Sequence, residues 1–138
     1  MLFRSKFSNI MSYHFTTTVD QSFDDAIETV TAALKDKGFG VLTTIDVQKA
    51  MKEKIDKDIN PYTILGSCNP GYAYKAIQAE NKIGTMLPCN VVVQQADDGT
   101  IEVSAVDPMA SMQAIENPDL GGIAGEVRAM LQEVIAGL

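Results

Sequence analysis

Two strand-like runs joined by a tight turn constrain the fold more than any other feature of the sequence. Residues 89–95 contain Val91-Val92-Val93, a run that is typical of a strand buried on both faces. A second strand is predicted by apolar residues that alternate with other residues at Ile101, Val103 and Ala105. Asp98-Gly99 favours a tight hairpin turn between the two runs. The sheet must therefore be antiparallel at this point.

The first half of the chain alternates between strand and helix patterns. Residues 13–19 are rich in threonine and aromatic residues, which predicts a strand. A pattern similar to a capping box at Ser22 begins a helix, and Gly38 can end it. The apolar face of this helix consists of Phe23, Ala26, Ile27, Val30, Ala33 and Leu34. Residues 39–47 predict a second strand, and residues 48–55 predict a short exposed helix.

A third strand and a further helix follow a turn that ends at Pro61. Residues 62–68 alternate in the manner of a strand. Asn69-Pro70 directly after it predicts a helix that runs to about Glu80, because asparagine is a preferred N-cap and proline is preferred in the first turn. We expect residues 81–87 to form a loop with an apolar end.

Two more helices are predicted after the hairpin. Asp107-Pro108 repeats the cap-plus-proline signal and predicts a short helix through Ile115, which Asn117-Pro118 then ends. The last helix is amphipathic, with an apolar stripe at Leu120, Ile123, Val127, Met130, Leu131 and Val134.

Together these patterns predict an α+β protein. We expect two layers, with a mostly antiparallel five-stranded sheet and helices packed mainly on one face, in the order β-α-β-(α)-β-α-β-β-α-α. A chain of 138 residues fits one domain. We expect residues 1–11 to form a flexible N-terminal tail and residues 12–138 to form the single α+β domain. The sequence is compatible with a start at Met1 or at Met11.

The charge of the chain limits the partners that it can bind. Its 11 lysine and arginine residues oppose 18 aspartate and glutamate residues, which gives a net charge of −7. Nucleic acids and anionic membrane surfaces attract basic patches, so we expect neither as a partner. No apolar run reaches the roughly 20 residues that span a bilayer, and residues 1–10 lack the apolar region of a signal peptide. We therefore expect a cytoplasmic protein with reduced thiols.

The two cysteines of the chain each precede an asparagine at a predicted strand end. Cys68-Asn69 closes the third strand, and Cys89-Asn90 opens the fourth. If these strands are antiparallel, the thiols are neighbours; if they are parallel, the sulfur atoms lie roughly 20 Å apart. Because the fourth and fifth strands form a hairpin, we expect an antiparallel sheet and neighbouring thiols. Cys68 also precedes a helix, whose N-terminal field lowers the pKa of a thiol that points toward it.

These positions define a candidate ligand or thiol site. Its members are Cys68, Asn69, Cys89 and Asn90, with Tyr72, Met86 and Leu87 as walls. In this hypothesis Cys68 is the more nucleophilic sulfur, Cys89 is its resolving partner or co-ligand, and the asparagines fix loops or a ligand. The alternative is that each cysteine is a small buried apolar residue and each asparagine makes a cap or loop hydrogen bond.

Several segments around the cysteines form a signature. They are Leu65-Gly66-Ser67-Cys68-Asn69-Pro70, Ala73-Tyr74, Ile83-Gly84, Leu87-Pro88-Cys89-Asn90-Val91-Val92-Val93, and Gly38-Phe39-Gly40-Val41-Leu42. In these segments the chain resembles the domain-of-unknown-function 302 family, over Ser12 to roughly Leu138. The resemblance implies a small bacterial or archaeal α+β protein that is often dimeric, and it implies no established reaction.

Three functions are compatible with the sequence. The first is a domain that binds a small-molecule ligand or is thiol-active through the paired Cys-Asn site. The second is a non-enzymatic homodimeric interaction module in which the Cys-Asn elements are structural. The third is ligation of a metal or haem by the sulfurs, although no ligand spacing predicts a metal site and His14 is the only histidine. The sequence specifies no cofactor, and it does not decide whether the chain is an enzyme.

Overall fold

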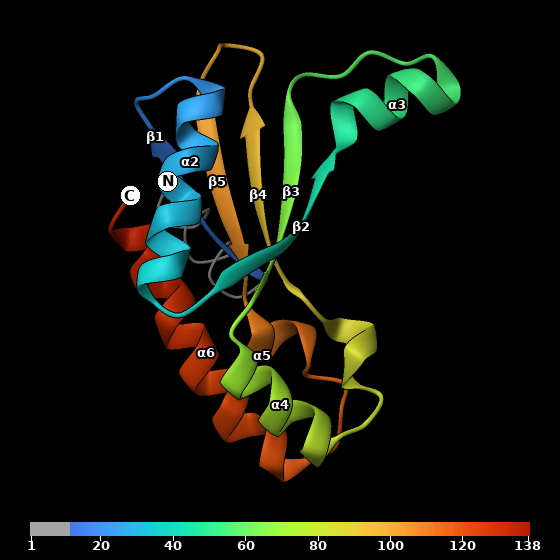
Figure 1. Cartoon of the computed structure of the whole chain (residues 1–138), viewed down its shortest axis with the longest axis vertical. Helices are drawn as coiled ribbons and strands as arrows, with labels where there is room; N and C mark the ends of the chain where they lie inside the picture. The colour runs from blue at the N-terminus through green and yellow to red at the C-terminus, as the bar shows by residue number, and fades with distance from the viewer. Residues whose placement is uncertain (1–11) are drawn as a thin grey trace.

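Five strands form an antiparallel sheet at the centre of the molecule (Figure 1). They are β1 (His14–Val19), β2 (Gly40–Asp46), β3 (Tyr62–Cys68), β4 (Cys89–Gln95) and β5 (Ile101–Val106). Their order across the sheet is β1-β5-β4-β3-β2, and every neighbouring pair is antiparallel. The computed structural model describes residues 12–138, and the tail predicted for residues 1–11 lies outside the described residues.

The predicted hairpin of β4 and β5 lies in the middle of the sheet. Val91 and Val93 are fully buried on one face, whereas Val92 between them is only half-buried on the other. The expectation that this strand is buried on both faces is therefore wrong. The second face is not covered by the main helices and carries polar side chains, among them Thr16 and Ser104, whose hydroxyl oxygens are hydrogen-bonded at 2.8 Å.

Helices cover the other face of the sheet, which confirms the predicted two-layer α+β architecture (Figure 1). The helical elements are α2 (Phe23–Asp36), α3 (Val47–Ile55), α4 (Pro70–Ala79), the 3-10 helix η1 (Ile83–Met86), α5 (Pro108–Ser111) and α6 (Pro118–Ala136). Ser22 caps α2 as predicted, since its Oγ accepts a hydrogen bond from Asp25 N at 3.2 Å. Lys37 Nζ after α2 lies 2.7 Å from Glu133 Oε2 of α6. No helix within residues 12–138 is long and apolar enough to cross a membrane.

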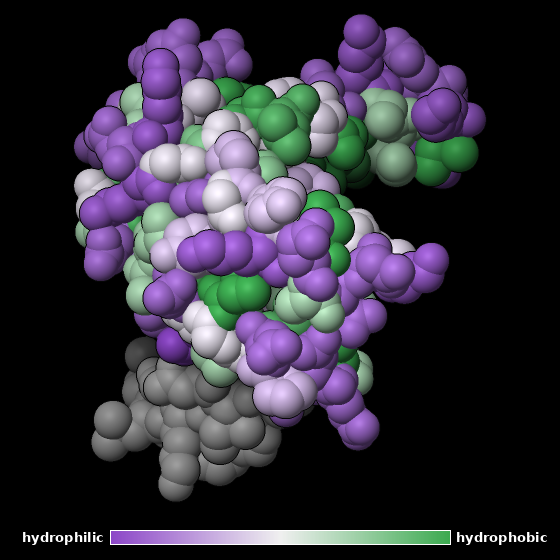
Figure 2. Space-filling model, turned by 60° about the horizontal axis from the view of Figure 1, so that its bottom comes forward, coloured by the Kyte–Doolittle hydropathy of each residue, from purple (hydrophilic) through white to green (hydrophobic). Residues whose placement is uncertain are grey.

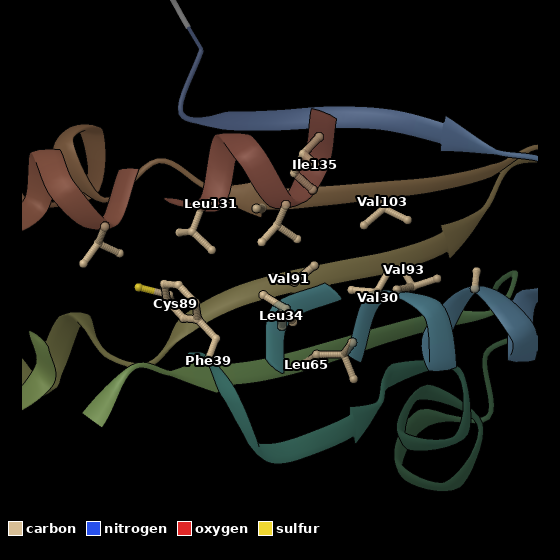
Figure 3. Packing of buried hydrophobic residues seen from close by; sticks show 14 of the residues in the cluster. Val30, Leu34, Phe39, Leu65, Cys89, Val91, Val93, Val103, Leu131 and Ile135 are labelled. Carbon is tan, nitrogen blue, oxygen red and sulfur yellow. The ribbon is translucent and has the colours of Figure 1, made fainter. Parts of the chain in front are cut away.

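The main hydrophobic core lies between the sheet and the two long helices, α2 and α6. The helices contribute Ala26, Val30, Leu34, Val127, Leu131, Val134 and Ile135. Figure 3 shows labelled side chains of both helices directed toward Val91 and Val93 of β4. Burial of a side chain of this size stabilises a fold by roughly 1.5–3 kcal/mol. This core therefore holds the sheet and the two helices together.

A second, smaller core lies under α4, η1 and α5. Its buried residues are Ala76, Ile83 and Leu120, and Leu87, Met112, Ile115 and Ile123 pack against it. The loop expected over residues 81–87 contains η1, which turns Ile83 inward. Helix α5 ends at Ser111 rather than at the predicted Ile115, because the chain leaves the helix in turns that bring Ile115 against this smaller core.

Helix α3 projects from the end of β2 as an arm (Figure 1). Its predicted exposure is confirmed, since none of its residues is buried. Asp46 Oδ1 caps the helix by accepting a hydrogen bond from Lys49 N at 2.9 Å, and Asp56 ends it with a left-handed φ of 53°. Figure 2 shows that the surface of this arm is largely hydrophilic.

The close packing of β3 gives a first testable prediction. A Cβ atom at Gly66 would lie 2.5 Å from Thr43 Cγ2 and 2.9 Å from Pro88 Cγ. We expect Gly66→Ala to lower the free energy of unfolding by about 1–3 kcal/mol, because the added methyl group overpacks this site. Gly40→Ala is the matched control in a neighbouring strand, since nothing lies within 4 Å of its Cβ position. Urea denaturation measures both variants, and equal stabilities would contradict this packing.

Candidate functional site

Pairing between β3 and β4 brings the two cysteine positions to the same end of these neighbouring strands. The strands are antiparallel, and Ser67 is the register partner of Cys89. Cys68 is therefore the next residue along β3 after the partner of Cys89. Ser67 Oγ donates a buried hydrogen bond to the Cys89 carbonyl oxygen at 2.7 Å, which fixes the two strand ends. Both cysteines are free thiols.

A half-open pocket lies at this end of β3 and β4, between the main core and the smaller core. Cys68 and Cys89 both line it. The main core contributes Phe39 and Val127 to its walls, and the smaller core contributes Ala76, Leu87 and Met112. The cavity measures about 40 Å³, whereas a single water needs about 10–15 Å³ by the same measure. The lining is almost entirely hydrocarbon and sulfur, so the pocket suits an apolar or soft group of a few heavy atoms.

Side-chain hydrogen bonds fix the three helices that wall the pocket. Asp107 Oδ1 caps α5 by accepting from Met109 N at 3.0 Å, and its Oδ2 accepts from Arg128 Nε of α6 at 3.1 Å. Asn117 Nδ2, at the start of α6, donates to the Ala79 carbonyl at the end of α4 at 2.8 Å. The relative positions of α4, α5 and α6 are therefore set by polar contacts outside the apolar pocket.

Two charged groups lie close to Tyr72, which is one of the two aromatic residues of the pocket lining. The Glu126 carboxylate accepts a hydrogen bond from the Tyr72 hydroxyl; this bond, followed by desolvation and the charge of Glu126, raises the pKa of the phenol. Lys75 Nζ lies 5.3 Å from the centroid of the Tyr72 ring, within the range of a cation–π contact. Polar contacts therefore border a pocket whose interior is apolar.

The structure brings some of the predicted site residues together and separates others. The pocket is lined by Cys68, Asn69, Tyr72, Leu87 and Cys89. Asn90 instead lies on the opposite face of the sheet, in a broader hollow of about 450 Å³, because adjacent strand residues face opposite sides. Met86 is 41% exposed and does not line the pocket. The two Cys-Asn dipeptides therefore do not form one four-residue site.

Asn69 is the N-cap residue of α4 as predicted, but its side chain makes no capping hydrogen bond. It lies instead against Gly38, where a Cβ atom would be 3.1 Å from Asn69 Nδ2. Gly38 also has a φ of +84°, a conformation that glycine adopts without strain. The turn after α2 and the start of α4 therefore meet at these two residues, and the first N–H groups of α4 receive no cap from Asn69.

The thiols differ from the predicted thiolate site. Burial raises the pKa of the Cys68 thiol above its ordinary value of 9.0, which is the opposite of the predicted direction. Burial, and then repulsion from Cys68, raises the pKa of the Cys89 thiol to about 11. The prediction relied on the field of the α4 N-terminus, whereas desolvation dominates at this edge of the core. Both thiols therefore carry their protons at neutral pH.

Several further residues line the pocket that were not among the predicted site residues. They include Phe39, Ala73, Ala76, Met112, Ala124 and Val127. Their positions depend on how helices pack together, and no local motif marks them. Met112 had one available signal, since it is a soft sulfur residue within the predicted helix that follows Asp107.

Comparison with known proteins places the chain in a family. The sequence profile of DUF302, a domain of unknown function, matches residues 15–138. The chain belongs to the DUF302 family. This confirms the resemblance that the segments around the cysteines indicate.

The DUF302 chain is also similar to a solved structure. The crystal structure of an uncharacterized conserved DUF302 protein from Bacillus stearothermophilus is 30% identical in sequence, with a TM-score of 0.84. The match covers 91% of this chain and 97% of that one. No curated protein matches the chain at a significant level.

The raised pKa of Cys89 predicts a loss of stability at alkaline pH. The unfolded chain releases this proton near pH 9.0 and the folded DUF302 domain near 11, so the folded state holds the proton more tightly. The protonated thiol therefore adds to the stability of the fold. This stabilisation is fully present below pH 9.0 and is lost as the pH rises to about 11. The free energy of unfolding should decrease by about 3 kcal/mol over this range. Urea denaturation across this range should show a shallower pH dependence for Cys89→Ala than for the natural chain. Parallel pH profiles would contradict the prediction.

Proposed function

We propose that this DUF302 domain binds a small ligand in the pocket beside Cys68 and Cys89. The observation that carries the proposal is a half-open cavity lined by hydrocarbon and sulfur between two hydrophobic cores. Apolar surface left open to water costs roughly 25 cal/mol per Å² relative to burial. A ligand that covers this surface gains that free energy on binding.

The composition of the lining favours binding over catalysis. Among the described residues, neither a carboxylate nor an imidazole lines the pocket. Tyr72 and the two thiols can also exchange protons in principle, but their raised pKa values keep them protonated at neutral pH. Small residues, Ala73, Ala76 and Ala124, supply much of the wall instead, and their short side chains leave room between α4 and α6. We therefore propose a binding domain rather than an enzyme.

Dissolved xenon tests whether the pocket admits a ligand, because xenon enters apolar cavities without needing polar contacts. Under xenon pressure, the NMR signals of the Ala76 and Ala124 methyl groups should shift, whereas that of Ala33 in α2 should not. Ala73→Leu should abolish the shifts by filling the pocket. Gln78→Leu adds the same side chain on the exposed side of α4 and should leave them unchanged. Absence of shifts in the natural chain would refute ligand entry.

Self-association is a second candidate function, and the exposed edge of β2 favours it. Within residues 12–138, β2 pairs only with β3, so no other described strand satisfies the backbone N–H and C=O groups of its second edge. Leu42 is 71% exposed and Ile45 is 45% exposed, and the strand contains no lysine or proline to block pairing. A second copy can pair with this edge in a closed two-fold dimer.

Sedimentation equilibrium tests this second function. We expect the natural chain to sediment as a dimer and Leu42→Lys to shift it toward the monomer, because a charge on the edge opposes strand pairing. Ile77→Lys is the control, since it changes an exposed apolar residue on α4. A natural chain that remains monomeric at every concentration would exclude self-association through β2.

A further inference from the structure

Three sulfur-containing side chains line the same pocket. Cys68 ends β3, Cys89 begins β4, and Met112 follows α5 in the chain. These residues are far apart in the sequence, and the antiparallel β3–β4 pair and the packing of α5 against α6 bring them to one cavity. The polar side chains of the lining have other contacts: Ser67 donates to the Cys89 carbonyl, the Tyr72 hydroxyl bonds Glu126, and Asn69 lies against Gly38. Sulfur is therefore the main ligand type that the lining leaves available.

This donor set selects among metal ions. Mg²⁺ and Ca²⁺ require oxygen ligands, and a structural Zn²⁺ requires four protein ligands from Cys, His and carboxylates. Within residues 12–138, no group of three or more His, Cys, Asp or Glu side chains is placed to hold a metal ion. Thiolate and thioether sulfurs favour soft cations, of which Cu(I) is the biological example.

We propose that this pocket binds a single Cu(I) ion through the sulfur atoms of Cys68, Cys89 and Met112. The inference rests on the proposed function, because it names the ligand class of the same pocket. A cavity of about 40 Å³ has room for one ion but not for haem or a metal cluster. The hydrocarbon walls of the pocket limit the access of water to the ion.

Binding is a ligand exchange without oxidation or reduction. Cu(I) replaces the protons of two thiols, so one Cu(I) ion binds and two protons enter solution. The resulting bis-thiolate complex carries one negative charge. The N-terminus of α4 begins directly after Asn69, and its first N–H groups receive no side-chain cap from that residue. These groups and the positive end of the helix favour an anionic complex at this place.

An anaerobic competition titration tests the inference. Cu(I) is supplied as its bicinchoninate complex, whose colour fades as the full-length chain removes the ion. We expect one Cu(I) per chain and the release of two protons in weakly buffered solution. Cys68→Ala and Cys89→Ala should each weaken binding by more than about 100-fold, since loss of even an outer partner costs 10–100-fold.

The two methionines of the α5 region provide a matched pair. Met112→Leu should weaken Cu(I) binding by about 10-fold, because leucine keeps the volume and removes the sulfur. Met109→Leu should leave it unchanged, since Met109 is 47% exposed and does not line the pocket. Equal effects of the two substitutions would overturn the role of Met112 as a ligand.

The outcomes separate this inference from the proposed function. Xenon entry without Cu(I) binding would overturn the copper site and leave the ligand pocket standing. Failure of both probes would overturn both. Cys89 is buried, and Cys89→Ala is interpreted only if its circular dichroism spectrum matches that of the natural chain. Cys68→Ala changes a half-buried residue and carries the test independently, so unchanged Cu(I) affinity in this variant would refute the site.

Discussion

The antiparallel pairing of β3 with β4 is the constraint on which the rest of the structure depends. The chain leaves the sheet after Cys68, forms α4 and η1, and returns to the sheet at Cys89, beside the point where it left. Parallel strands would place these residues at opposite edges of the sheet, separated by the length of a strand. The excursion also creates the smaller core, because α4 and η1 must bury their own apolar side chains. One pairing therefore produces both the neighbouring cysteines and the pocket beside them.

The position of the pocket between two cores decides its chemistry. Sulfur atoms at this boundary lose water on one side and meet hydrocarbon on the other, so desolvation has a stronger effect on their ionisation than a nearby helix end. A protonated thiol in such a place is a poor nucleophile, and a metal ion that binds it must displace its proton. The local environment therefore disfavours the covalent chemistry that their sequence context suggests.

Much of the fold could be predicted from local sequence patterns, and much of the site could not. Ser22, Gly38 and Asp98-Gly99 act on their immediate neighbours, so the helix and turn that they mark are correctly predicted. Asn69 has the signal of a capping side chain, yet tertiary contact with Gly38 takes that side chain elsewhere. Asn90 belongs to the second Cys-Asn dipeptide, but successive residues of a strand face opposite sides of the sheet. Its side chain therefore lies on the face away from the pocket. Met112 reaches the pocket through the packing of α5 and α6, which no short pattern encodes.

The unequal size of the two cores has a consequence for the motions of the chain. Among residues 12–138, the main cluster has 15 buried residues, whereas the smaller one has three, namely Ala76, Ile83 and Leu120. Opening α4 and η1 exposes far less apolar surface than global unfolding and therefore costs less free energy. We expect the amide hydrogens of α4 and η1 to exchange with solvent through such partial openings while the sheet stays folded. This wall of the pocket opens at a lower cost than the sheet, so molecules larger than the closed cavity have a route to the sulfur atoms.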